Sequence, residues 1–112
     1  MSCLFCSIAE GTIPSNKAYE DDTCLVFHDI SPQAPVHLLV IPKEHIESVA
    51  AVTEENASII SHMMTVIAKL AKELKLESGF RVVSNCGKDA QQSVTHLHFH
   101  LLAGREFGWP PG

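Results

Sequence analysis

The stretch His96-Leu97-His98-Phe99-His100-Leu101-Leu102 decides how this sequence is interpreted. Side chains alternate between the two faces of a β-strand. A strand over Thr95–Leu102 therefore places the three histidines on one face and Leu97, Phe99 and Leu101 on the other. The apolar face can pack into a core. Histidine is not a strong strand former, so a row of three such rings predicts chemistry rather than a cover for a sheet.

A single metal ion held by all three rings fits this row poorly. A strand rises about 3.3 Å per residue, so the Cα atoms of His96 and His100 lie about 13 Å apart. Zinc ligands must converge on one ion with metal–nitrogen bonds of about 2.0–2.1 Å. We therefore expect the three histidines to divide between two functions.

The N-terminal segment indicates the first of these functions. Cys3 and Cys6 have the Cys-x-x-Cys spacing of zinc ligands. His45 follows a strand end marked by a proline, and His96 begins the histidine row, so a closed site of Cys3, Cys6, His45 and His96 is expected to bind Zn²⁺. Two alternatives stay open. The cysteines can form a redox pair, although no strand precedes them, or pack as small apolar side chains.

His98 and His100 are then left for catalysis. A neutral imidazole is a good nucleophile near neutral pH because its ordinary pKa is about 6.5. Attack by such a ring on phosphorus divides one difficult displacement into two easier steps. The polar loop Gly87–Ser93, which includes Gln91, precedes the row and can supply N–H and hydroxyl donors to phosphate oxygens.

The rest of the chain predicts an α+β fold, with a mostly antiparallel sheet, one long helix and a short N-terminal helix. Apolar residues recur at helical spacing from Ile59 to Leu74, with Thr53 as N-cap, Glu54 and Glu55 in the first turn, and Lys72 and Lys75 at the end. The short helix covers Cys3–Glu10 and ends at Gly11. The other expected strands are Ala18–Glu20, Cys24–His28, His37–Ile41 and Phe80–Asn85.

Composition limits the partners. The 112 residues carry a formal net charge of −5, which argues against binding nucleic-acid polymers but not against one nucleotide at a local site. The length predicts one domain over residues 1–112. No signal peptide or membrane-spanning run is recognisable. We therefore expect a cytoplasmic protein without a membrane partner, with its cysteines reduced or metal-bound.

The sequence resembles the histidine-triad (HIT) family, whose motif alternates three histidines with apolar residues, as His96–Leu102 does here. Within that family it is similar to the nucleotide-binding (Hint) branch. That similarity rests on Asp29–Pro35 followed by His37, on Gln92-Ser93-Val94, on Gly104-Arg105, and on Trp109–Gly112. It implies a single HIT-like domain that forms a homodimer with two purine nucleotide sites.

The resemblance also implies an activity: hydrolysis of purine nucleoside 5′-phosphoramidates, with His98 forming a nucleotidyl intermediate. The third histidine is typically glutamine in the transferase branch, so His100 favours hydrolysis. His37 supports the row, and Asp29 accepts both ribose hydroxyls. The base is enclosed by Leu4, Phe5, Phe27, Ile30 and Leu39. By the same resemblance, His100 and the catalytic residue Ser93 contact the α-phosphate, and Asn85 lies beside it. Gln91 is a further nucleotide-binding residue, and Trp109 borders the site of the partner.

Two other functions compete with this one: hydrolysis of dinucleoside polyphosphates, and a regulatory nucleotide-binding dimer without a catalytic role. Two positions depart from the family pattern. Ala90 and Gln91 stand where many relatives have two glycines, and Thr95 stands where an aromatic residue is common. Because glycine permits close approach of the backbone to a phosphate, the loop is expected to be less open here.

Overall fold

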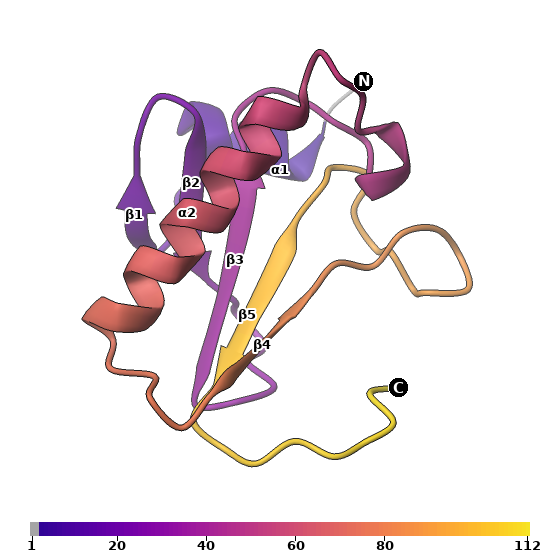
Figure 1. The fold of residues 1–112 in the computed structure, drawn as a ribbon. Coiled ribbons are helices and arrows are strands. Elements are labelled where there is room, and N and C mark those ends of the chain that lie inside the picture. The colour runs from indigo at the N-terminus through magenta and orange to yellow at the C-terminus, as the bar shows by residue number, and fades with distance from the viewer. Residues whose placement is uncertain (1–2) are drawn as a thin grey trace.

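The structure is a computed structural model that describes residues 3–112 (Figure 1). Within this range the chain forms two α-helices, one short 3₁₀ helix and a five-stranded sheet. In chain order the elements are α1 (Leu4–Glu10), β1 (Lys17–Glu20), β2 (Cys24–His28), β3 (Val36–Pro42), η1 (Val49–Ala51), α2 (Ala57–Glu73), β4 (Phe80–Val83) and β5 (Phe99–Ala103).

The sheet has the strand order β1-β2-β3-β5-β4, and every neighbouring pair is antiparallel. The predicted α+β class is therefore confirmed. β3 lies at the centre, and the register places Leu39 opposite Phe27 on β2 and opposite His100 on β5. β4 forms one edge of the sheet. β5, the strand that follows His98 in the chain, lies between β3 and β4.

The two faces of the sheet have different covers. The long helix α2 crosses one face, and α1 lies behind the other (Figure 1). Beneath α2 the core combines Met63, Val66, Ile67 and Leu70 with strand residues that include Leu97, Phe99 and Leu101. Beneath α1 a smaller cluster contains Phe5, Ile8, Leu25, Phe27, Leu39 and Ile41. The expected separation of apolar and histidine faces is thus confirmed for the three apolar residues of the row.

The last strand is shorter than predicted. The sequence predicts a strand over Thr95–Leu102, but β5 covers Phe99–Ala103, and the ladder with β3 starts at the pair Val40 and Phe99. The segment before it pairs elsewhere, since the N–H of Leu97 donates to the carbonyl of Ile46 at 2.6 Å. His96 and His98 therefore precede the strand, and only His100 lies within it.

The long helix also begins later than predicted. Asn56, not Thr53, is the N-cap, and Glu54 and Glu55 lie in a turn before the helix. The Asn56 side-chain oxygen accepts from the N–H of Thr53 at 2.7 Å, and this bond closes the preceding turn. The helix ends at Glu73, because Lys75 adopts a left-handed conformation with φ of 58°.

Smaller corrections concern element ends. Cys3 is the N-cap of α1 rather than its first residue, while Gly11 ends that helix as predicted. β1 and β3 extend slightly beyond their predicted ranges, and β4 ends at Val83, not at Asn85. Among residues 3–112, no helix is long and apolar enough to cross a membrane.

Candidate active site and candidate metal centre

Three histidine rings meet where β3 and β5 lie side by side. His37 on β3 and His100 on β5 are joined by a hydrogen bond of 2.9 Å between His37 Nε2 and His100 Nδ1. The ring centroids of His98 and His100 lie 5.2 Å apart. His37 and His98 are buried and His100 is partly buried. The three rings that the sequence assigns to the reaction are therefore brought together.

The partners of these rings fix which nitrogen of each carries the proton. The backbone N–H of Gln33 donates to His37 Nδ1 at 3.0 Å, so the proton of neutral His37 is on Nε2. Asp29 Oδ2 lies 3.4 Å from that Nε2 and requires the same proton position. His37 Nε2–H then donates to His100 Nδ1, which leaves the proton of His100 on its Nε2.

His98 has the opposite tautomer. Its Nδ1 lies 2.7 Å from the backbone carbonyl of His96, and a carbonyl oxygen only accepts, so Nδ1 carries the proton. The Nε2 of His98 therefore holds a lone pair. The site combines a ring with a nucleophilic nitrogen and, next to it, a ring with an available N–H donor on His100.

Burial keeps the rings of His37 and His100 neutral. It lowers the pKa of His100 to about 4, and the neighbouring rings of His98 and His37 act in the same direction against the opposing carboxylate of Asp29. Burial also lowers the pKa of His37, again opposed by Asp29. Near pH 7 both rings are uncharged, which is the form that the hydrogen-bond chain requires.

The predicted base-enclosing residues divide into two groups. Phe5, Phe27 and Leu39 are buried in the α1-side cluster, and the ring of Phe5 meets the rings of Phe27 and His98 edge-on, with centroids 5.7 and 5.0 Å apart. Leu4 is exposed, and Ile30 is 98% exposed. The first group forms a wall beside His98, whereas the second faces solvent in this chain.

The predicted phosphate-side residues are partly buried or exposed. Asn85 follows the end of β4 and is partly buried, while Gln91 and Ser93 are exposed. Neither Gln91 nor Ser93 forms a side-chain hydrogen bond within residues 3–112. Trp109 is 83% exposed in the C-terminal tail. The structure thus places Gln91, Ser93 and Trp109 on the surface of this chain.

The side chain of Gln92 holds the polar loop Gly87–Ser93 in place. Gln92 accepts from the N–H of Gly87 at 3.0 Å and donates to the carbonyls of Glu47 and Val94 at 2.7 and 3.0 Å. These bonds attach the loop to the segment before η1. Gln91, which occupies a position of the family's glycines, has a φ of 61°, and glycine adopts this conformation at lower cost.

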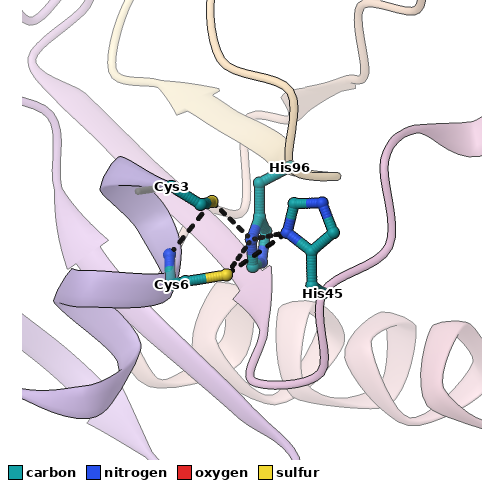
Figure 2. Close-up of side chains that lie close together, drawn as sticks. All are labelled: Cys3, Cys6, His45 and His96. Atoms are coloured by element: carbon teal, nitrogen blue, oxygen red, sulfur yellow. Dashed lines mark hydrogen bonds between the residues drawn. The ribbon is translucent and has the colours of Figure 1, made fainter. Parts of the chain in front are cut away.

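The four predicted metal ligands converge at the other end of the row. The Sγ atoms of Cys3 and Cys6 and one ring nitrogen each of His45 and His96 all lie within 4.8 Å of one another. Figure 2 shows the two cysteines, on and just before α1, facing both rings. Cys3 Sγ lies 3.3 Å and Cys6 Sγ 3.5 Å from His96 Nδ1, and Cys6 Sγ lies 3.2 Å from His45 Nδ1.

This donor set fits a tetrahedral ion. Zinc bonds of about 2.0–2.3 Å place neighbouring ligand atoms about 3.3–3.8 Å apart, and the sulfur–nitrogen distances here are 3.2–3.5 Å. His96 Nε2 lies 2.8 Å from the carbonyl of Pro42, so Nε2 carries the proton and Nδ1 presents its lone pair to the thiols. Cys3 and Cys6 are free thiols, not a disulfide.

Fold and site together define a class of protein: a small α+β domain in which three histidines line up opposite the face covered by a long helix. Residues 2–107 match the family described as scavenger mRNA decapping enzyme C-term binding. An uncharacterized HIT-like protein of Synechococcus elongatus is 44% identical over 109 residues, 97% of this chain and 96% of the relative. The chain belongs to the histidine-triad (HIT) family.

Solved structures agree with this assignment. A HIT family hydrolase from Legionella pneumophila is 45% identical and superimposes with a TM-score of 0.97 over 99% of this chain and 100% of that one. A histidine triad nucleotide-binding protein from Candida albicans is 37% identical, with a TM-score of 0.82 over 99% of this chain and 85% of that one. The HIT-like fold expected from the resemblance is thus confirmed. Membership of the Hint branch stays a prediction.

Proposed function

We propose that the protein is a nucleotide-binding hydrolase that cleaves purine nucleoside 5′-phosphoramidates through a nucleotidyl intermediate on His98. One observation carries this proposal. The His96 carbonyl holds the Nδ1 proton of His98, so the Nε2 lone pair is available beside the N–H donor of His100. The name of the Legionella relative supports hydrolysis, and that of the Candida relative supports nucleotide binding.

The reaction has two displacements at phosphorus. In the first, His98 Nε2 attacks the α-phosphorus, the phosphorus–nitrogen bond to the amine breaks, and the amine leaves with a proton taken from solvent. In the second, water attacks the same phosphorus and the bond to Nε2 breaks, which releases the nucleoside monophosphate. The Nε2–H of His100 donates to a phosphoryl oxygen, where negative charge develops in both steps.

The remaining contacts place the nucleotide. Phe5, Phe27 and Leu39 offer an apolar wall for the purine next to His98. Asp29 accepts from the N–H of Ser31 through Oδ1 and approaches His37 through Oδ2. Each carboxylate oxygen has two lone pairs, so capacity remains for the two ribose hydroxyls.

The intermediate provides the test of this proposal. The protein is incubated with an adenosine 5′-phosphoramidate of a lysine-type amine and, separately, with diadenosine polyphosphates, and initial rates are compared. We expect faster turnover of the phosphoramidate and, after rapid acid-free quenching, an adenylylated peptide containing His98. Faster turnover of the polyphosphates would instead favour a dinucleoside polyphosphate hydrolase. Nucleotide binding without turnover of either would favour a regulatory dimer.

We also propose that two copies pair through the β4 edge. Phe80 and Val82 on this edge strand are 40% and 39% exposed, and Met64 and Leu74 on α2 are exposed as well. A cavity of about 310 Å³ between the end of α2 and β4 is lined mainly by apolar surface. A second copy related by a two-fold axis can cover this surface and extend the sheet. Trp109 would then border the partner's nucleotide site.

Light scattering tests the pairing. The wild-type protein is expected to have the mass of two chains at micromolar concentration, and Val82→Asp is expected to have the mass of one. Val82→Thr, which keeps a β-branched side chain on the edge, is the matched control and should stay dimeric. A monomeric wild-type protein would contradict the proposal.

Finally, we propose that Cys3, Cys6, His45 and His96 bind Zn²⁺. When bound, the ion supplies a structural cross-link and no chemistry at phosphorus, because four protein ligands leave no open position. The thiols hold α1 against His45 and His96, and α1 carries Phe5, the ring that meets His98. Metal analysis of protein purified without chelators is expected to give about one zinc per chain, and protein without zinc would reject this assignment.

A further inference from the structure

The loop between β2 and β3 holds the outer end of the histidine hydrogen-bond chain. The N–H of Gln33 donates to His37 Nδ1 at 3.0 Å and, together with Asp29 Oδ2 at 3.4 Å from Nε2, fixes the tautomer of His37 and, through His37, that of His100. The Gln33 side chain donates to the carbonyl of Ser31 at 2.9 Å, so this part of the loop is folded on itself. The orientation of a catalytic N–H therefore depends on where one loop amide lies.

A second segment, just after β5, fixes the position of this loop. Arg105 Nε donates to the carbonyl of Gln33 at 3.1 Å. The neighbouring Gly104 has a φ of 94°, and a Cβ placed there would lie 2.8 Å from the Cβ of Pro35. The backbone of residue 104 thus packs directly against the loop. Gln33 is held from both sides, at its N–H by His37 and at its carbonyl by Arg105.

The exposed side chain of Arg105 makes its polar contacts at this position. The sequence contains two arginines, Arg81 and Arg105. Within residues 3–112, neither forms an ion pair with a carboxylate. Arg105 instead donates to two backbone carbonyls, those of Gln33 and Glu106, and its guanidinium lies 4.3 Å from the centroid of the Phe107 ring. A guanidinium that stacks on an aromatic ring presents its N–H groups in fixed directions.

We propose that Arg105 is a positioning residue for the reaction: through the Gln33 carbonyl it holds the loop amide that keeps the proton of His37 on Nε2 and the proton of His100 facing the phosphate. Without that amide, His37 can place its proton on Nδ1. Its Nε2 then accepts from His100 Nδ1–H, and His100 turns a lone pair toward the phosphoryl oxygen. This proposal rests on the proposed function for its catalytic meaning, but not for the tautomer itself.

The test separates the effect of the hydrogen bond from Arg105 to Gln33 from that of the contact between Arg105 and Phe107. Arg105→Met removes every donor while keeping an apolar stem, and Arg105→Lys keeps a charged donor that can reach the carbonyl. Phe107→Leu is the matched control, because it removes the ring under Arg105 and leaves the bond to Gln33. Thermal unfolding of each variant verifies that it is folded before it is used.

The primary measurement is the tautomer of each histidine, from ¹⁵N chemical shifts and long-range ¹H–¹⁵N correlations on the nucleotide-free protein at pH 7.5. We expect a single Nε2–H tautomer for His37 and His100 in the wild type, Arg105→Lys and Phe107→Leu. In Arg105→Met we expect a mixture of tautomers. With a phosphoramidate substrate, kcat of Arg105→Met should fall about ten- to hundredfold, the size of effect that follows misplacement of a catalytic group, while KM changes less than threefold.

Two results would overturn the proposal. One is an unmixed Nε2–H tautomer with wild-type kcat in folded Arg105→Met. The other is a mixed tautomer in Phe107→Leu that matches that of Arg105→Met, which would assign the effect to the tail. If the wild type hydrolyses no phosphoramidate, the proposed function fails, and the tautomer measurement still decides the role of Arg105.

Discussion

His96 and His100, the two ends of the histidine row, each lie two residues from His98, but their surroundings differ. His96 precedes β5, and its ring faces two thiols and a second imidazole. His100 lies inside β5 and faces a third imidazole supplied by β3. Each ring has one nitrogen committed to a partner, a carbonyl for His96 and His37 for His100. The function that we propose for each histidine therefore follows from its second nitrogen: in His96 this nitrogen faces two cysteine thiols, and in His100 it is left free to donate.

His98 lies between these two environments and belongs to both. Its Nδ1 proton is held by the carbonyl of His96, and its ring meets that of His100 and that of Phe5 from α1. The His96 end thus supplies the backbone carbonyl that orients His98, the proposed nucleophile, and the His100 end supplies an N–H donor beside it. Changes at the two ends are expected to differ in what they alter: stability through a bound metal at the His96 end, and the reaction rate and the pH dependence of stability at the His100 end.

The largest effect is expected at the nucleophile. His98→Asn should reduce turnover of a phosphoramidate by several orders of magnitude, because the amide cannot form the covalent intermediate. Nucleotide affinity should stay within a few-fold of the wild type, since the wall formed by Phe5, Phe27 and Leu39 is unchanged. Single-turnover kinetics and calorimetric titration with a nucleoside monophosphate measure the two quantities. Wild-type turnover by His98→Asn would remove His98 from its assigned role.

The next effect is expected at the His96 end. Cys6→Ser should lose the bound metal and with it the cross-link between α1 and the rest of the chain, and the melting temperature should fall on the order of 10 °C. A chelator should lower the melting temperature of the wild type by a similar amount and leave Cys6→Ser unaffected. Cys86→Ser, at an exposed cysteine outside the cluster, is the matched control. Equal chelator sensitivity in all three proteins would contradict a site at these ligands.

The His100 end is expected to govern stability in acid. Burial lowers the pKa of His100 from 6.5 to about 4. The unfolded chain therefore binds a proton more readily than the folded one between these values. This contribution to the free energy of unfolding is fully present above pH 6.5 and is lost as the pH falls toward 4, by at most about 1.4 kcal/mol per pH unit.

Urea unfolding at a series of pH values measures this slope. The lowered pKa of His37 acts in the same direction, so His100→Gln should reduce the slope without abolishing it. His28→Gln is the matched control, because His28 is an exposed histidine at the end of β2. An identical slope in the wild type and His100→Gln would show that His100 does not titrate in this way.

The comparison also shows what sequence could and could not provide. The alternation of apolar residues with histidines predicted the core positions Leu97, Phe99 and Leu101 correctly. An extended backbone buries every second side chain whether or not it pairs with a neighbouring strand. The same alternation predicted a strand that is too long at its N-terminal end. Strand length depends on pairing with a neighbouring strand, and the backbone N–H of Leu97 donates to Ile46 instead of to β3. The spacing of Cys3 and Cys6 indicated ligands, but their meeting with His45 depends on how α1 packs.

The support of the active site was largely invisible in sequence. The tautomer of His37 depends in part on a backbone N–H, and Gln33 supplies it through its place in the loop, not through its side chain. Gly104 and Arg105 were recognised only as part of a motif. Their role depends on a contact across 72 residues of sequence, between Arg105 and the carbonyl of Gln33. No local pattern encodes such a contact.

The smallest effect is expected in the loop Gly87–Ser93 before the histidine row. A substitution there tests whether His96 or His100 depends on the conformation of this loop. Gln91 adopts a φ of 61°, which costs a non-glycine residue roughly 1 kcal/mol. Gln91→Gly should therefore raise the free energy of unfolding by up to about 1 kcal/mol, less the entropy that glycine gains in the unfolded chain. Gln91→Ala, which keeps a Cβ, should not.

Metal content and the histidine tautomers should be unchanged in both variants, because Gln92, not Gln91, attaches the loop to the rest of the chain. Urea unfolding measures the free-energy difference between the two variants, and equal stabilities would show that the left-handed conformation carries no measurable strain.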